Sequence, residues 1–178
     1  ACSSSDDIAK GGAQTTEGEP LKVVTTVSPL TSIVENIGGA RIRLEGIIPE
    51  GVNSHTFEPS PSVARVMSEA DLIVLNGLFL EEPSLEMAEA NKKPGAVILT
   101  LGDKAISLEE WVFDFSFPES DGHPNPHLWT SPVLALKYAE LIRDELAALD
   151  PPNADDYNEN YEKLKARIED LDSRIAVA

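Results

Sequence analysis

Short apolar runs alternate with amphipathic stretches over the N-terminal part of the chain. Three runs are rich in Val, Ile and Leu without interruption, whereas a fourth alternates between apolar and polar residues, as a half-exposed edge strand does. Together they predict four strands, at 22–27, 41–48, 71–75 and 96–101. Helical spacing of apolar residues follows Ser28-Pro29 and Ser60-Pro61, and a weaker helix is expected within 80–91. We therefore predict an α/β fold: a four-stranded parallel sheet with helices on both faces.

The C-terminal part is predicted to be helical after a long connection. Residues 102–126 have no sustained periodicity and are expected to form mostly loop. Helical spacing then follows Pro132, is interrupted at Pro151-Pro152, and resumes in a long helix from about Ala154 to Ala178. Its apolar stripe consists of Tyr157, Tyr161, Leu164, Ile168, Leu171 and Ile175. No Gly or Pro ends this helix before Ala178, so we expect the chain to be cut in mid-helix.

Charge narrows the range of partners. The chain has 31 acidic and 14 basic residues, a formal net charge of -17. Nucleic acids and anionic membrane surfaces need basic patches on their partners, so neither is expected to bind here. No apolar run approaches the roughly 18 residues that a membrane-spanning helix requires.

The single cysteine, Cys2, excludes an intrachain disulfide and a zinc site built from several thiolates. The segment Ala1-Cys2-Ser3-Ser4-Ser5 resembles the junction of a bacterial lipoprotein, in which lipid is attached to the cysteine after a signal segment is removed. Residues 1–20 are rich in small and polar residues and are predicted to be a flexible tether. An unmodified cysteine is the alternative.

Two histidines in similar turns are the main candidates for chemistry. His55 follows the second predicted strand and His127 follows the fourth, and each precedes a Ser-Pro helix start. Because ligands bind beyond the carboxyl ends of parallel strands, both side chains are expected at the same edge of the sheet. Neutral imidazole is a common ligand for zinc and other first-row metals, but two histidines are only half of a tetrahedral site. The alternative for each is a solvated loop histidine.

Three residues near these turns are candidates for accessory roles. Glu58 is either a carboxylate favoured by the start of the following helix or a partner of a ligating histidine. His123 is either a loop residue without a role or a transient metal contact. Trp129 is expected to pack against the turn that holds His127.

Several blocks of the sequence resemble the zinc/manganese-type solute-binding proteins of bacterial ABC importers. They are Val23 to Gly39, His55-Thr56-Phe57-Glu58-Pro59-Ser60-Pro61, Ala70 to Gly77, Asn125-Pro126-His127-Leu128-Trp129, and Asp150-Pro151-Pro152-Asn153 with Tyr157, Asn160 and Tyr161. The resemblance runs in order from about residue 20 to 178. It implies two α/β lobes joined by one long helix, with a metal ion between the lobes.

On this resemblance, the family's first two metal ligands fall on His55 and His127. Two more would come from a second lobe that this chain lacks. The resemblance divides the chain into the tether at 1–20, an N-terminal metal-binding lobe at 21–131, and a helical segment at 132–178 that includes the inter-lobe helix. The sequence departs from the family pattern at Asn53-Ser54, where Asp-Pro is frequent, at Asn125, where Asp is usual, and at Thr130-Ser131, which replaces Leu-Asp.

The function expected from this resemblance is capture of Zn²⁺ or Mn²⁺ outside the cytoplasm and its delivery to an ABC importer. The ion would be cargo and not a catalytic cofactor, so the protein is not expected to be an enzyme. Its partners would be the metal ion and the importer's permease. Contact with the membrane would be made only through lipid on Cys2, and the full-length protein would be a monomer. Two alternatives come from other classes: a surface adhesion lipoprotein, and a metal-dependent hydrolase in which Glu58 would be the only nearby candidate for a general base.

Overall fold

Four parallel strands form the centre of the molecule in a computed structural model, which describes residues 18–177. The strands are β1 (Leu21–Thr25), β2 (Ile42–Gly46), β3 (Leu72–Leu75) and β4 (Val97–Thr100). Their spatial order is β2-β1-β3-β4, so β1 lies between β2 and β3, with Val23 beside Leu44 and Leu72. The predicted parallel sheet is confirmed, and each strand is shorter than its apolar run. Cys2 and most of the predicted tether lie outside the described residues.

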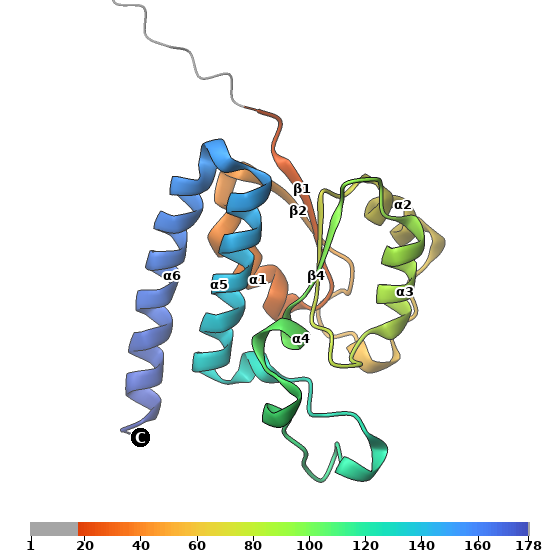
Figure 1. Cartoon of the computed structure of the whole chain (residues 1–178), viewed down its shortest axis with the longest axis vertical. Coiled ribbons are helices and arrows are strands. Elements are labelled where there is room, and N and C mark those ends of the chain that lie inside the picture. Colours follow the sequence, from red (N-terminus) through yellow and green to blue (C-terminus); the bar gives the residue numbers. More distant parts are fainter. Residues whose placement is uncertain (1–17, 178) are drawn as a thin grey trace, which may run out of the picture.

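Helices cover both faces of this sheet, as predicted (Figure 1). One face carries α1 (Ser28–Gly38) and α5 (Pro132–Leu149), and α6 (Ala154–Ile175) packs against these two helices. The other face carries α2 (Pro61–Glu69) and α3 (Glu82–Asn91), which contact each other. In the described part of the chain, no helix combines the length and the apolarity needed to cross a membrane.

The connection after β4 differs from the prediction at its start. Residues 101–105 form a short helix, α4 (Leu101–Ala105), where mostly loop was expected. The turn forms because Leu101 is fully buried and the Gly102 N–H donates to the Asn76 carbonyl, at 2.7 Å. A Cβ on Gly102 would lie 2.7 Å from the Leu78 side chain, so this close approach requires glycine. Irregular backbone with single 3-10 turns follows as far as α5.

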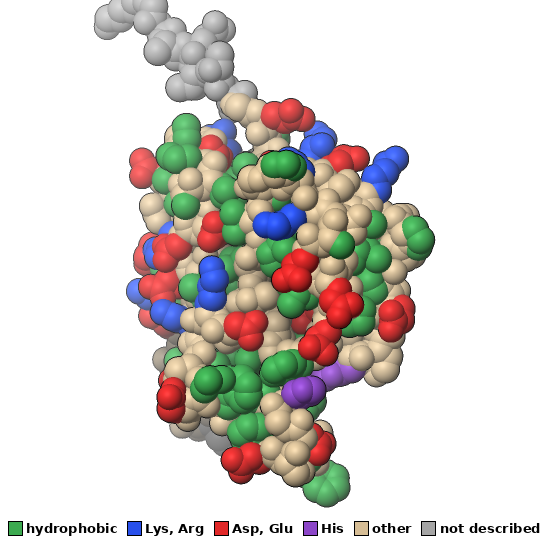
Figure 2. Space-filling model, turned by 45° about the vertical axis from the view of Figure 1, so that its right-hand side comes forward, with side chains coloured by type: hydrophobic (Ala, Val, Ile, Leu, Met, Phe, Trp, Pro, Cys, Tyr) green, Lys and Arg blue, Asp and Glu red, His purple; other side chains and the backbone are tan. Residues whose placement is uncertain are grey.

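On the face that Figure 2 shows, charged side chains of both signs are spread over the described residues and the basic ones do not form one patch. The view shows acidic side chains in red across the molecule with basic ones among them. Several are paired, for example Arg41 with Asp156 at 2.6 Å and Lys93 with Asp71 at 2.6 Å. Such exposed pairs contribute little to stability, on the order of 0–1 kcal/mol each.

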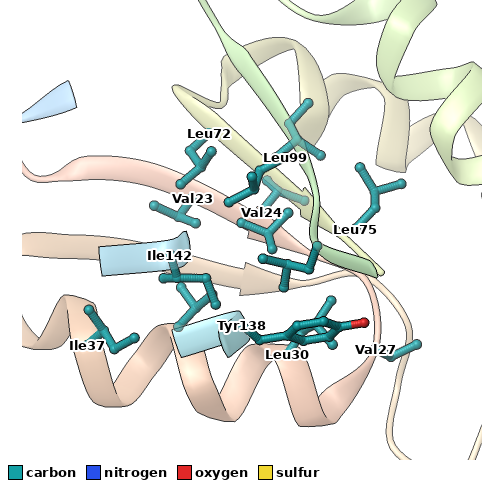
Figure 3. Close-up of a cluster of buried hydrophobic side chains, with 14 of the residues drawn as sticks. Val23, Val24, Val27, Leu30, Ile37, Leu72, Leu75, Leu99, Tyr138 and Ile142 are labelled. Atoms are coloured by element: carbon teal, nitrogen blue, oxygen red, sulfur yellow. The ribbon is translucent and has the colours of Figure 1, made fainter. Parts of the chain in front are cut away.

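The main core lies between the sheet and the α1/α5 layer (Figure 3). It is built from fully buried aliphatic side chains of the strands, such as Val23 and Leu72, against Leu30, Tyr138 and Ile142 of the two helices. The α1 positions follow the predicted helical spacing, which explains why a single face of that helix is buried. This packing holds the carboxyl ends of the strands in fixed positions, and the candidate site lies at that edge.

The apolar stripe of α6 is buried only in its first half. Tyr157 is fully buried and Leu164 is 8% exposed, whereas Leu171 is 45% and Ile175 56% exposed. The helix begins at Ala154, as the sequence predicted, directly after a 3-10 turn at Pro151–Asn153. Its second half therefore extends beyond the part of α1 and α5 that can cover it.

Candidate metal-binding site

The two candidate histidines lie together at the carboxyl edge of the sheet. His55 is in a 3-10 turn, Ser54–Thr56, in the connection after β2, and His127 directly precedes the 3-10 turn that leads into α5. Their Nε2 atoms are 3.2 Å apart although 72 positions separate them in the chain. Figure 2 shows histidine side chains, in purple, at the surface of this end of the molecule.

Asn125 fixes the orientation and the tautomer of His127. Its Oδ1 accepts a hydrogen bond from the backbone N–H of His127, at 2.9 Å, and lies 2.8 Å from Nδ1 of the ring. Its Nδ2 donates to Oδ2 of Asp114, at 2.6 Å, so the amide cannot be turned the other way. Nδ1 of His127 must therefore carry the proton and donate it to Asn125. The lone pair of the neutral ring is then on Nε2, which faces His55.

The turn at His55 repeats part of this arrangement. Oδ1 of Asn53 accepts the backbone N–H of His55, at 3.0 Å, as Asn125 does two residues before His127. Both turns thus use an Asn-x-His sequence in which the Asn side chain caps the His backbone. Because Nε2 of His127 has a free lone pair, the proton between the two rings belongs to Nε2 of His55. For a metal ion to be bound by both rings, this proton has to move to Nδ1 of His55, which leaves the lone pair of the neutral ring on Nε2.

Aromatic side chains surround the pair. The Phe117 ring centroid lies 5.7 Å from that of His55 and 5.5 Å from that of His127. Trp129 meets His127 edge to face, at 5.2 Å between centroids, so it packs against this turn as the sequence predicted. Such contacts restrict the rotation of the imidazole rings, which reduces the entropy that binding has to remove.

The other accessory candidates lie outside the pair. His123 stacks on Phe79, with centroids 4.2 Å apart and planes 11° apart. Glu58 is exposed, and within residues 18–177 it forms no hydrogen bond with either histidine. In the same part of the chain, no three His, Cys, Asp or Glu side chains come close enough together to hold a metal ion.

The distance between the two Nε2 atoms suits shared coordination of one ion. Zn–N bonds are about 2.0–2.1 Å long, so two nitrogens of a tetrahedral site lie about 3.3–3.4 Å apart, and two at right angles about 2.9 Å apart. The observed 3.2 Å lies between these values, so it is compatible with either geometry. Two nitrogens leave further coordination positions for water or for groups from elsewhere.

Electrostatics keep His127 neutral. Its partial burial lowers the pKa of the imidazole, and the neighbouring His55 lowers it further, against a smaller opposite effect of the Asp114 carboxylate. The hydrogen bond from Asn125 in turn lowers the pKa of Asp114, which stays ionised. A metal ion needs the neutral imidazole, so this arrangement keeps His127 ready for binding over a wider range of acid pH.

The sequence did not point to Asp114 or Phe117. Both lie in the irregular connection before α5, where neither helical nor strand spacing marks a position. A cavity of about 230 Å³ lies beside His127 and is lined in part by Val112 and Leu134. Another cavity, of about 680 Å³, lies at the opposite end of the sheet, where charged side chains such as Arg41, Asp150 and Asp156 line it.

A family model described as the periplasmic component A of a zinc-uptake complex (ZnuA) matches residues 23–178. The chain belongs to the ZnuA family. This confirms the family resemblance inferred from several blocks of the sequence, two of which contain the histidines. Members of this family are solute-binding components and not enzymes.

Similar proteins of the ZnuA family are named for different metals. The manganese-binding lipoprotein MntA of Halalkalibacterium halodurans is 36% identical over 173 residues, which cover 94% of this chain and 54% of that protein. The iron-binding protein YfeA of Yersinia pestis is 34% identical and is covered over 48% of its length. The chain thus spans about half the length of the curated relatives it matches.

Solved structures agree with this family and with its fold. The Cd-bound periplasmic metal binding protein from Candidatus Liberibacter asiaticus is 32% identical, with a TM-score of 0.74 over 84% of this chain and 53% of that one. The periplasmic zinc binding protein TroA from Treponema pallidum is 22% identical with a TM-score of 0.78, over 89% of this chain and 54% of that one, and it shows likeness of fold alone.

Proposed function

We propose that this chain provides half of the metal site of an extracytoplasmic solute-binding protein, in which His55 and His127 bind one divalent transition metal ion. Zn²⁺ or Mn²⁺ would be cargo that the complete protein delivers to the permease of an ABC importer. The observation that carries the proposal is the approach of the two Nε2 atoms to 3.2 Å, in a member of a metal-uptake family.

The cellular setting is part of the same proposal. Relatives are named as manganese-binding or manganese-transporter lipoproteins, which supports lipid attachment at Cys2 and a location outside the cytoplasm. We propose that the remaining metal ligands come from a further lobe, because the relatives are about twice as long and two nitrogens do not complete a site. The complete protein would act as a monomer in which the long helix within residues 132–178 joins the two lobes.

The proposal is tested by isothermal titration of Zn²⁺ and Mn²⁺ into this chain. We expect one equivalent of metal to bind weakly, because only two protein ligands are present, and we expect the His55→Ala/His127→Ala double variant to bind none. His123→Ala is the matched control, since His123 is an exposed histidine that stacks on Phe79. If all three proteins bind alike, surface carboxylates are responsible and the proposed site has to be abandoned.

A further inference from the structure

A buried polar cluster lies beneath the histidine pair and has no role in the function proposed so far. Its centre is Asn76, at the end of β3, which is fully buried. The Asn76 side chain accepts a hydrogen bond from the hydroxyl of Tyr138, at 2.8 Å, and donates one to the carbonyl of Pro126, at 3.0 Å. Figure 3 shows the Tyr138 hydroxyl, in red, pointing towards the end of the sheet at which the strands terminate.

The contact with Pro126 connects the core to the candidate site. Pro126 directly precedes His127 and is buried. Among the hydrogen bonds within residues 18–177, the one from Asn76 is the one that joins the segment 124–128 to the sheet. The other hydrogen bonds of this segment connect it to itself, to His55 or to its own loop, for example from Asn125 to Asp114.

Glu81 binds the backbone N–H of Asn76 inside the core. Its Oε1 accepts the Asn76 N–H and the Thr26 hydroxyl, both at 2.7 Å, and the side chain is only 3% exposed. Burial raises the pKa of this carboxyl, against the opposing effect of its hydrogen bonds. Among the described residues, its second oxygen has no hydrogen-bond partner. A buried carboxyl with an unsatisfied oxygen is costly, so its presence calls for an explanation.

The backbone next to Asn76 is strained as well. Gly77, Leu78 and Phe79 all have positive φ angles, of 76°, 53° and 62°. Two consecutive residues other than glycine in this conformation are unusual, and such strain persists only where the surrounding structure imposes it. Here the Leu78 N–H is held by Asp103, at 3.2 Å, and Asn76 is held by Glu81.

We propose that Asn76 is a positioning residue of the metal site: its buried side-chain amide, held by Tyr138 while Glu81 holds the Asn76 backbone, sets the place of the Pro126–His127 backbone so that the His127 ring faces His55. The inference rests on the proposed metal function of the histidine pair. The unsatisfied oxygen and the strained turn are then the cost of a rigid core contact directly behind one ligand.

Asn76→Asp separates this role from a purely structural one. The aspartate keeps an oxygen for the Tyr138 hydroxyl but replaces the group that donates to the Pro126 carbonyl with a second oxygen. Thr26→Val is the matched control, because it removes a buried hydrogen bond to Glu81 from the same cluster and leaves the Asn76 side chain unchanged. Urea unfolding measures what each variant costs in stability, and titration with zinc alone measures the site.

We expect Asn76→Asp to weaken zinc binding by about tenfold or more, and Thr26→Val to leave it unchanged. Equal losses of affinity in both variants, in proportion to their losses of stability, would overturn the proposal.

A second measurement needs no metal. In the metal-free wild-type chain, nuclear Overhauser contacts should join the two imidazole rings, and the ring nitrogen shifts should show Nδ1 of His127 protonated. We expect Asn76→Asp to lose the contacts and Thr26→Val to keep them.

If the wild type binds no zinc, the proposed function fails, while the ring contacts still decide whether Asn76 positions His127. If Asn76→Asp does not unfold cooperatively, Tyr138→Phe takes its place, and unchanged ring contacts and zinc affinity in that variant would count against the proposal.

Discussion

At the scale of single residues, the partner of the His127 ring is a neutral amide and not a carboxylate. Oδ1 of Asn125 accepts the ring proton, and the negative charge lies one step further away, on Asp114. The arrangement still fixes the tautomer, because Asp114 prevents the amide from turning. It places less negative charge next to the imidazole than a direct carboxylate would, which is consistent with the lowered pKa of His127.

Removing this amide should weaken metal binding. Asn125→Ala frees the ring to rotate and to move its proton, so we expect the Zn²⁺ dissociation constant to rise by about 10- to 100-fold, the usual effect of losing a partner of a ligating histidine. Asn53→Ala is the control, since it removes only a backbone contact of the other turn and should have a smaller effect. Equal effects of the two changes in calorimetry would argue against tautomer control by Asn125.

The pH dependence of metal binding follows from the protonation of His127. A proton competes with the metal for Nε2, and the pKa of this ring is below the ordinary value of about 6.5. We therefore expect the contribution of His127 to Zn²⁺ affinity to be constant above that value and to be lost as the pH drops through the lowered pKa of this ring. Titrations between about pH 5 and 8 check this over the range in which imidazole changes charge. Affinity that does not change with pH would contradict coordination by neutral imidazole.

At the scale of elements, spacing along the chain predicted the regular helices and strands and missed the features that depend on tertiary contacts. The four strands and the helices that follow Ser28-Pro29 and Ser60-Pro61 were predicted because buried faces repeat with a fixed period. The juxtaposition of the two histidines followed from the rule for strand ends. The α4 turn was missed because its formation depends on Asn76 and Leu78, which are distant in sequence.

The same limit applies to the residues that support the site. Asn76 directly follows a predicted strand and had no predicted role in the site, although its side chain contacts Pro126, 50 positions later. Asp114 and Phe117 belong to a loop whose path is set by tertiary contacts. Contacts of this kind have no period, so a single sequence does not reveal them.

The two halves of the α6 stripe should respond differently to truncation. Leu164 is 8% exposed and belongs to the core, so we expect Leu164→Ala to lower the free energy of unfolding by about 2–3 kcal/mol. Leu171 lies two turns further along the same stripe and is 45% exposed, so Leu171→Ala should change it by less than about 0.5 kcal/mol. Urea unfolding of both variants measures the difference. Equal losses would mean that the second half of α6 is packed in solution.

At the scale of the whole molecule, a metal ion that binds only the folded chain should raise its stability. Zinc at about a hundred times its dissociation constant should add about 2.7 kcal/mol and raise the melting temperature. The His55→Ala/His127→Ala double variant provides the control, because its melting temperature should not respond. A wild-type chain that binds zinc in calorimetry without any thermal shift would show that the ion also binds the unfolded chain.

The distance in sequence between the two histidines has a mechanical consequence. An ion held by both rings ties together two points 72 residues apart, and α2, β3, α3 and β4 all lie between them. A loaded chain pulled from its ends would therefore keep this segment closed as a loop until a metal–nitrogen bond breaks. At about 3.3–3.6 Å per residue, roughly 250 Å of extended chain would stay hidden from the pulling force. The bound ion would then act as a removable cross-link between His55 and His127. A chelator that takes up the ion would expose the chain between them to the pulling force.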